Sequence, residues 1–123
     1  MNIFYLDKNP KVAAEMHCNK HVIKMVLEYA QILSTAHRII DGDEAGDERG
    51  LYEIAYKNHP STAWARLGRG NYNYLSDLWA WLGIEYTHRY GKIHKAATLE
   101  WLHYSPDNIP KKTLLTGLTS APP

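Results

Sequence analysis

The stretch HVIKMVLEYAQIL, residues 21–33, decides the expected fold because its apolar residues recur with the period of an α-helix. At about 100° per residue, its apolar side chains cover most of the helix circumference, and its polar side chains share a strip about 80° wide. A surface helix usually has a polar face of half the circumference or more. We therefore expect a helix that is buried on most sides and has one narrow polar strip.

The polar strip consists of residue types that can take part in chemistry. Lys24 and Glu28 lie one turn apart and can simply stabilise the helix by roughly 0.2–0.5 kcal/mol. A narrow strip can also be no more than the part of the helix that reaches solvent. Two histidines, a lysine and a glutamate on one line favour a cleft lined by the strip. The candidate catalytic residues are Glu28, Lys24, His21 and His17, and Gln31 and Thr35 continue the strip.

Start and stop signals extend the helical pattern along the chain. Asn9 and Pro10 are typical of a helix start, and the pattern stays helical to about Ile40. The Gly- and Asp-rich segment 41–50 is expected to be a solvated loop. A second helix is expected from Pro60 to about Tyr90, weakened or kinked at the glycines of LGRGN.

The two ends of the chain and the region after the second helix complete the expected fold. The pattern of residues 92–104 predicts a third, shorter helix, which ends at Ser105 and Pro106. Residues 1–6 are expected to be an extended lead-in, and residues 111–123 a packed coil. The sequence therefore predicts one all-α domain over residues 1–123, and it leaves open whether the domain continues beyond Pro123.

Composition narrows the class of protein. A chain of 123 residues with 45% hydrophobic and 22% charged residues is typical of a soluble single domain. The single Cys18 excludes an intramolecular disulfide, and no stretch resembles a signal peptide or a membrane span. We therefore expect a cytoplasmic protein with no membrane partner. Segment 41–50 has a local charge of −4 and the whole chain +1, so the remaining residues are mildly basic.

Polar residues outside the strip are candidates for substrate binding. His59 lies before Pro60 at a predicted helix start, where backbone N–H groups favour an anion. Arg66, Arg69, Lys92 and Lys95 are candidate phosphate contacts. The predicted substrate-binding residues are Gln31, His59, Arg66, Asn71, Glu85, Arg89 and Lys92.

Three motifs suggest a family. HVIKMVLEYAQIL, KNHPSTAW and YLSDLWAWLGIEYTHRYGK together resemble the pyrimidine dimer DNA glycosylase (endonuclease V-type) family, and most closely its uncharacterised phage and bacterial members. The resemblance extends over about residues 1–95 and implies a small all-α enzyme acting on damaged or modified double-stranded DNA. Such enzymes flip a base, attack C1′ of the damaged nucleotide with an amine and nick the strand through a Schiff base. The family's catalytic glutamate matches Glu28, and a histidine seven residues earlier matches His21.

The chain also differs from that family at named positions. The family's nucleophile is the α-amine of a threonine, and this chain has Asn2 after Met1. Leu27 and Gln31 replace two arginines beside the glutamate. The resemblance thus implies a DNA glycosylase or abasic-site lyase without a cofactor, in which the amine belongs to Met1 or Lys24 and Glu28 is the acid and base.

Two alternatives remain open at the level of the sequence. His17 and His21 have a spacing that can bind one metal ion from a helix, with a third ligand from Glu28, His59 or Glu85, as in a metal-dependent nucleotide hydrolase. The strip can also belong to a domain that binds a nucleic acid or another ligand without catalysis. The sequence does not fix the substrate or the oligomeric state.

Overall fold

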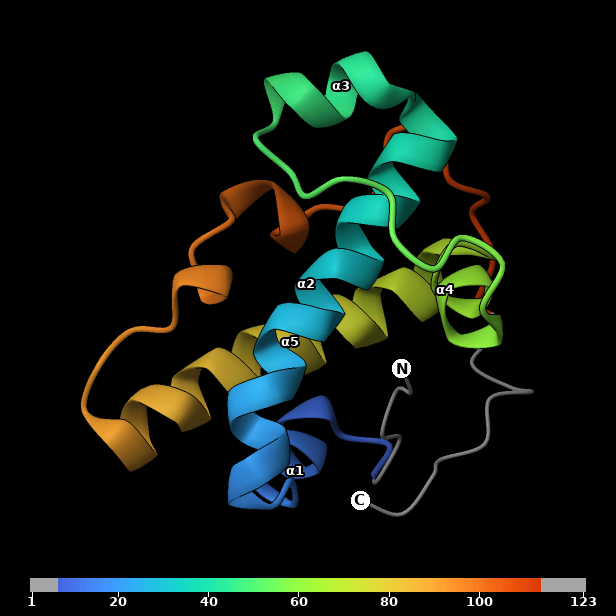
Figure 1. Ribbon diagram of the computed structural model, residues 1–123. Helices are drawn as coiled ribbons and strands as arrows, with labels where there is room; N and C mark the ends of the chain where they lie inside the picture. The colour runs from blue at the N-terminus through green and yellow to red at the C-terminus, as the bar shows by residue number, and fades with distance from the viewer. Residues whose placement is uncertain (1–6, 114–123) are drawn as a thin grey trace.

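The computed structural model describes residues 7–113, and all the regular structure in that range is helical (Figure 1). The expectation of an all-α fold is confirmed. The elements are α1 (Pro10–Glu15), α2 (Asn19–Asp41), α3 (Asp43–Glu48), α4 (Pro60–Ala65), α5 (Arg69–Tyr90) and the 3₁₀ turns η1 (Lys95–Ala97) and η2 (Glu100–His103). No helix in residues 7–113 combines the length and apolar character needed to cross a bilayer. The expected lead-in over 1–6 and all of the expected coil after Thr113 lie outside the described residues.

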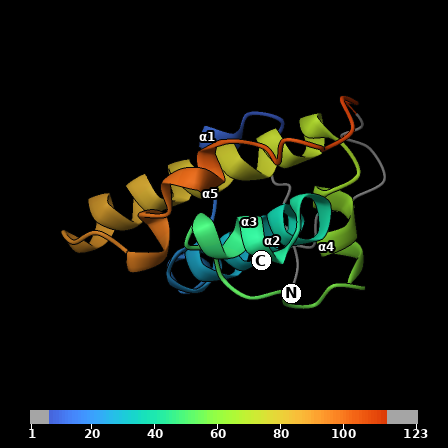
Figure 2. The same cartoon turned by 90° about the horizontal axis from the view of Figure 1, so that it is seen from above.

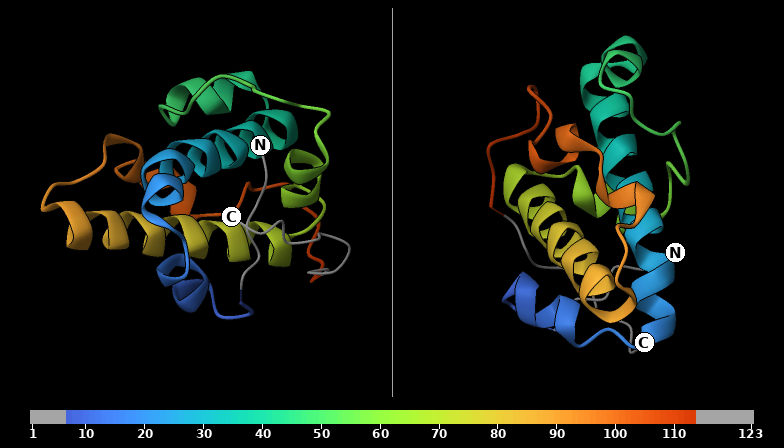
Figure 3. Two further views of the ribbon diagram at one scale, coloured as in Figure 1. Left: turned by 60° about the horizontal axis from the view of Figure 1, so that its bottom comes forward. Right: turned by 90° about the vertical axis from the view of Figure 1, so that its left-hand side faces the viewer.

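Helix α5 lies in the middle of the domain, with α2 on one side and α1 on the other (Figures 2 and 3). The core forms mainly where α2 and α5 pack together, through side chains that include Val26, Leu33, Leu75 and Trp79. Burial of such side chains stabilises a fold by about 1.5–3 kcal/mol each. The fold therefore fixes the position of α2 by packing one side of the helix against α5.

The helix expected from residue 10 to about residue 40 is broken at residues 16–18, so that prediction was wrong. The His17 ring turns inward and hydrogen-bonds to the Tyr29 hydroxyl at 2.9 Å. Arg89 of α5 donates to the His17 carbonyl oxygen at 2.9 Å, which satisfies a group that a continuous helix would have bonded internally. The break lets α1 fold back onto the far side of α5.

Two further predictions of local structure were wrong. Residues within the expected loop 41–50 form the helix α3, because acidic residues in its first turn suit the helix dipole and Arg38 donates to Asp47 at 2.9 Å. The expected helix over 92–104 is two separate 3₁₀ turns. Carbonyl groups of this segment accept hydrogen bonds from α5 side chains, Trp79 to Ala96 at 3.0 Å among them, and these bonds hold the segment against α5 in this path.

The expected interruption of the second helix is confirmed, and it separates α4 from α5. A Cβ atom at Gly68 would lie 2.8 Å from the Lys112 carbonyl oxygen, so a side chain at this position would clash. The Gly70 N–H donates to the same oxygen at 2.9 Å, and the Arg69 N–H donates to the Pro110 carbonyl oxygen at 2.8 Å. The segment before Thr113 therefore caps the start of α5.

Candidate functional site

A groove of about 670 Å³ runs along the exposed side of the first half of α2. Outside α2, the groove is lined by Tyr56 and by His94, which follows α5 in the chain. The groove is lined by Ile23, Lys24, Leu27, Glu28, Gln31, Tyr56 and His94. Lys24, Glu28 and Gln31 belong to the strip predicted from the sequence, so the structure places these three residues in one groove.

Helical spacing gives this groove two kinds of surface. Ile23 and Leu27 are one turn apart and both are exposed, which places an apolar patch beside the polar residues. The opposite side of the same turns is buried against the core through Val22 and Val26. Because the buried side of α2 packs against the core, the backbone that carries the groove side chains is held in place.

The Lys24 amine and the Glu28 carboxylate lie together on the groove, with Nζ 3.6 Å from Oε2. The Glu28 side chain is only 16% exposed, whereas the Lys24 side chain is 63% exposed. No donor in residues 7–113 hydrogen-bonds to the buried Oε2 of Glu28. Apart from the ion pair with Lys24, this oxygen has no hydrogen-bond partner among the described residues, and a carboxylate in such a place can act as a base.

The segment between α3 and α4 places Tyr56 on the groove. The Thr35 hydroxyl of α2 accepts from the Ala55 N–H at 3.0 Å and donates to the Ala55 carbonyl oxygen at 3.3 Å. The Tyr56 carbonyl oxygen then accepts from the His59 N–H at 3.0 Å. Tyr56 itself has a φ of 51°, which is uncommon for a bulky residue. Thr35, expected on the polar strip, is therefore buried and positions this segment.

His94 closes the other end of the groove. Its Nδ1 accepts from the Ala96 N–H at 3.1 Å, and its Nε2 donates to the Ile23 carbonyl oxygen at 3.2 Å. The ring also packs edge-on against Tyr86, with centroids 4.9 Å apart. His94 and Tyr56 were missed in the sequence because both lie in irregular segments, where helical periodicity gives no signal.

The structure separates the two predicted catalytic histidines from the groove. His17 is buried before α2 begins, where its ring bonds to the Ala13 carbonyl oxygen at 2.7 Å and to Tyr29. Burial lowers the pKa of His17, and the nearby His21 acts in the same direction. His21 is half-buried in the first turn of α2 and does not line the groove. His17 thus joins α1 to α2.

The other predicted binding residues do not line the groove. The His59 ring accepts from the Ser61 N–H at 3.1 Å and caps α4, and the buried Asn71 amide donates to the Trp64 carbonyl oxygen at 3.0 Å. Burial lowers the pKa of the Arg66 guanidinium. Lys92 is exposed, two residues before His94.

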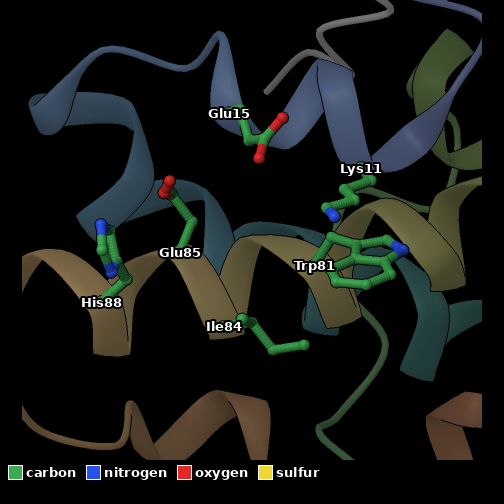
Figure 4. A pocket seen from close by; sticks show the side chains of 6 residues that line it. All are labelled: Lys11, Glu15, Trp81, Ile84, Glu85 and His88. Carbon is green, nitrogen blue, oxygen red and sulfur yellow. The ribbon is translucent and has the colours of Figure 1, made fainter.

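Glu85 and Arg89 form an ion pair of 3.6 Å on α5, on the side that faces α1. Arg89 also donates to the Glu15 carbonyl oxygen at 3.2 Å and to Asn19 Oδ1 at 3.0 Å. Glu85 lines a smaller pocket of about 250 Å³ between α1 and α5, shown in Figure 4. In this pocket Glu15 and Glu85 point into the gap between the helices, and Lys11 lies 5.0 Å from the centre of the Trp81 ring. This predicted pair therefore faces α1.

A metal centre finds no support in the part of the chain that the structure describes, since no three His, Cys, Asp or Glu side chains of residues 7–113 are placed to hold an ion. His17 and His21 are not brought together with Glu28 as ligands. No family model, no curated protein and no solved structure matches the chain. The chemistry of the groove is therefore the basis for a functional assignment.

Proposed function

We propose that the protein acts on damaged DNA as a glycosylase and abasic-site lyase, with the α2 groove as its site. The main observation in favour is the Glu28 carboxylate, nearly buried on the groove and 3.6 Å from the Lys24 amine. An amine is the nucleophile that Schiff-base chemistry needs, and an adjacent carboxylate can move the protons. The resemblance to the endonuclease V-type family points to the same chemistry and to the same glutamate.

The groove residues suffice for the lyase steps. After the Lys24 amine has lost a proton to the solvent, its nitrogen attacks C1′ of an abasic deoxyribose in its aldehyde form, and loss of water gives an imine. Glu28 then removes a proton from C2′, and the bond to the 3′ phosphate breaks, so that the phosphate leaves as the anion. Water hydrolyses the imine and returns the amine. With an intact nucleotide, the amine displaces the base from C1′, and the departing base takes up a proton.

Charge is distributed in a way that suits a DNA partner. The exposed Lys57 follows Tyr56 in the chain, and the exposed Lys92 and Lys95 flank His94. The acidic segment 41–50 lies at the other end of α2, away from the groove (Figure 1). The groove end of the molecule thus has lysines available for phosphate contacts, which supply most of the affinity for DNA in such proteins.

Borohydride trapping tests the proposal. The protein is incubated with duplexes that contain one abasic site or one ultraviolet-induced dimer, and borohydride reduces any imine to a stable adduct. We expect an adduct with the wild type and a loss of the adduct in Lys24→Ala or, if the α-amine of Met1 is the nucleophile, in a form with a blocked N-terminus. Lys20→Ala is the matched control, because Lys20 is also an exposed lysine of α2, one turn from Lys24.

The outcomes separate the candidate functions. An adduct lost in only one amine variant identifies the nucleophile. No adduct from the folded wild type with either duplex contradicts the proposal, and DNA binding without an adduct would then favour the non-catalytic binding domain. Equal loss in Lys20→Ala and Lys24→Ala would show that the lysines act only through their charge.

A further inference from the structure

We infer that Arg66, Arg69 and Lys112 form a separate DNA contact, which binds phosphate groups of the backbone several nucleotides away from the groove. This contact rests on the proposed function, because it concerns the part of the DNA that lies outside the groove. Three observations support it: the close approach of two segments of the chain, the surroundings of the two arginines and the distance from the groove.

Lys112 packs against the turn between α4 and α5, which contains both arginines. Gly68 lies between Arg66 and Arg69, and a Cβ atom added at Gly68 would lie 3.1 Å from Lys112 Cβ. The first two N–H groups of α5 donate to carbonyl oxygens of residues 110 and 112 at 2.8 and 2.9 Å, and these bonds hold the two segments together. Arg66, Arg69 and Lys112 therefore lie in one region, although Lys112 is far from the arginines in the sequence.

The positive charge of this region is not balanced by carboxylates. Residues 66–70 and 109–113 contain four cations and no acidic residue. Within residues 7–113, no carboxylate forms an ion pair with Arg66 or Arg69. The other three arginines of the chain each lie within 3.6 Å of a carboxylate oxygen, and these are Arg38, Arg49 and Arg89. Arg66 and Arg69 thus differ from the arginines that stabilise the fold.

Both arginines are half-buried, and each has a nitrogen that no acceptor satisfies. Nη1 of Arg66 and Nε of Arg69 are enclosed, and neither has a hydrogen-bond partner in residues 7–113. Burial lowers the pKa of Arg66, because the charged form loses water and gains no anion in return. An anion at the exposed side of these guanidinium groups offsets that loss. A phosphate suits this role, since a guanidinium can bind two of its oxygens at once.

The position of this region relative to the groove defines the part of the DNA that it contacts. Arg69 and His94 lie at opposite ends of α5, so the region is on the Tyr56 side of the groove (Figure 1). The chain from Tyr56 to Arg66 includes α4 and spans at most about 25 Å. Phosphates of one strand follow each other at about 3.4 Å along the duplex axis, so this span equals about seven nucleotides. Residues 54–76 contain no acidic residue that would repel a strand on this path.

Binding of a duplex that cannot be cleaved tests this inference. The duplex has a tetrahydrofuran in place of the abasic sugar, which has no aldehyde and forms no imine. Both of its arms are longer than about seven base pairs, and in two further duplexes one arm or the other is shorter than this span. Fluorescence anisotropy gives Kd for each duplex at a series of salt concentrations.

The variants remove or keep the charge of the two arginines. Arg66→Gln combined with Arg69→Gln removes both charges, whereas Arg66→Lys keeps the charge at its position. Lys11→Gln is the matched control, because Lys11 is an exposed cation of α1, on the other side of α5 from α2. Thermal unfolding checks the fold, and the double variant should keep a Tm close to that of the wild type, since neither arginine loses an ion pair.

We expect the double variant to lower the slope of log affinity against log salt concentration by about 2, because each lost phosphate contact lowers it by about 0.9. The wild type binds less tightly when one of the two arms is short, and the double variant does not show this difference. Arg66→Lys and Lys11→Gln behave like the wild type. A wild-type slope and a wild-type dependence on arm length in the double variant would overturn the inference.

Two further results would also overturn it. An equal fall of the slope in Lys11→Gln would show that the arginines act only through the total charge. Inorganic phosphate at constant ionic strength is the second probe. If it stabilises the wild type but not the double variant, and DNA binding is the same in both, the region binds free phosphate instead of DNA.

The two proposals can fail separately. If the wild type forms no borohydride adduct but the double variant lowers the slope and loses the dependence on arm length, the phosphate contact stands and the lyase is rejected. If the adduct forms and the double variant binds like the wild type, the lyase stands and the phosphate contact is rejected. If the wild type neither forms an adduct nor binds the duplex, both are rejected.

Discussion

The two halves of α2 use polar side chains in opposite ways. In the second half, Thr35, His37 and Arg38 are buried and bond to groups of later segments of the chain. In the first half, Lys24 and Glu28 face a groove, and Glu28 keeps a carboxylate oxygen without a donor in the described part of the chain. Burial of a polar group is thus no mark of a site by itself, because the buried groups of the second half stabilise the fold.

The second half of α2 holds the segment after α3 through one side chain. Arg38 donates to the Tyr52 carbonyl oxygen at 2.6 Å, to the Leu51 carbonyl oxygen at 2.9 Å and to Asp47 at 2.9 Å. These bonds fix the path of the chain toward Tyr56, which belongs to the groove. The second half of α2 therefore positions Tyr56, which lines the groove on the first half.

The largest expected effect is a loss of stability caused by a substitution in the second half of α2. Arg38→Ala leaves buried carbonyl groups without their donor, so the free energy of unfolding falls by about 3–5 kcal/mol. Urea unfolding followed by circular dichroism measures the change. Lys24→Ala is the comparison and shifts the same free energy by less than about 1 kcal/mol, because the Lys24 side chain is exposed. Equal losses in the two variants would contradict the contrast between the halves.

The next largest expected effect is a loss of nicking rate caused by a substitution in the first half of α2. Glu28→Gln keeps the shape of the side chain but cannot take the proton from C2′, so the rate of strand nicking falls by about 100-fold or more. Single-turnover assays on abasic duplexes measure the rate, and thermal unfolding should give a Tm close to that of the wild type. A normal nicking rate would exclude Glu28 as the base.

We expect the folded protein to lose stability in acid because of His37 in the second half of α2. Burial, followed by the nearby Arg49, lowers the pKa of His37 from 6.5 to about 4, and the Arg49 guanidinium donates to His37 Nδ1 at 2.9 Å. Between these two pKa values the unfolded chain binds a proton at His37 that the folded protein does not bind. Stability therefore falls as the pH is lowered from about 6.5 to 4, by up to about 3 kcal/mol.

Urea unfolding at a series of pH values measures this dependence. His37→Gln should be less stable than the wild type at pH 7 and should lose less stability between pH 7 and pH 4. Asp41, whose pKa is lowered through its bonds to Arg49, Asp107 and Asn108 in spite of burial, acts in the same direction only at lower pH. An unchanged slope in His37→Gln would assign the effect to other groups.

The smallest expected effect tests how tightly Arg38 is packed. A Cβ atom at Gly46 of α3 would lie 2.5 Å from Arg38 Cγ, so Gly46→Ala should cost about 1–3 kcal/mol of stability. In the Arg38→Ala background the space is open, and the same substitution should cost much less. The double-mutant cycle from urea unfolding measures this coupling. Additive losses would mean that the two side chains do not compete for the same space.

The sequence predicted those features that depend on periodicity. The pattern of residues 21–33 correctly indicates a helix with a narrow polar strip, and Lys24, Glu28 and Gln31 do share a groove. The break at residues 16–18 was missed because it depends on Arg89, which is distant in the chain and donates to the carbonyl groups there. Tyr56 and His94 were missed for a similar reason, since tertiary hydrogen bonds fix their positions and no local pattern encodes them.

The cap on α5 has a consequence for how the chain folds as it is synthesised. The first N–H groups of α5 bond to carbonyl groups of Pro110 and Lys112, and His37 of α2 bonds to the Tyr104 carbonyl oxygen. Both long helices are thus synthesised before the residues that accept these hydrogen bonds. At about 5–20 residues per second, this delay lasts on the order of seconds. The hydrogen bonds that cap α5 and hold His37 can therefore form only after residues 104–112 have been synthesised.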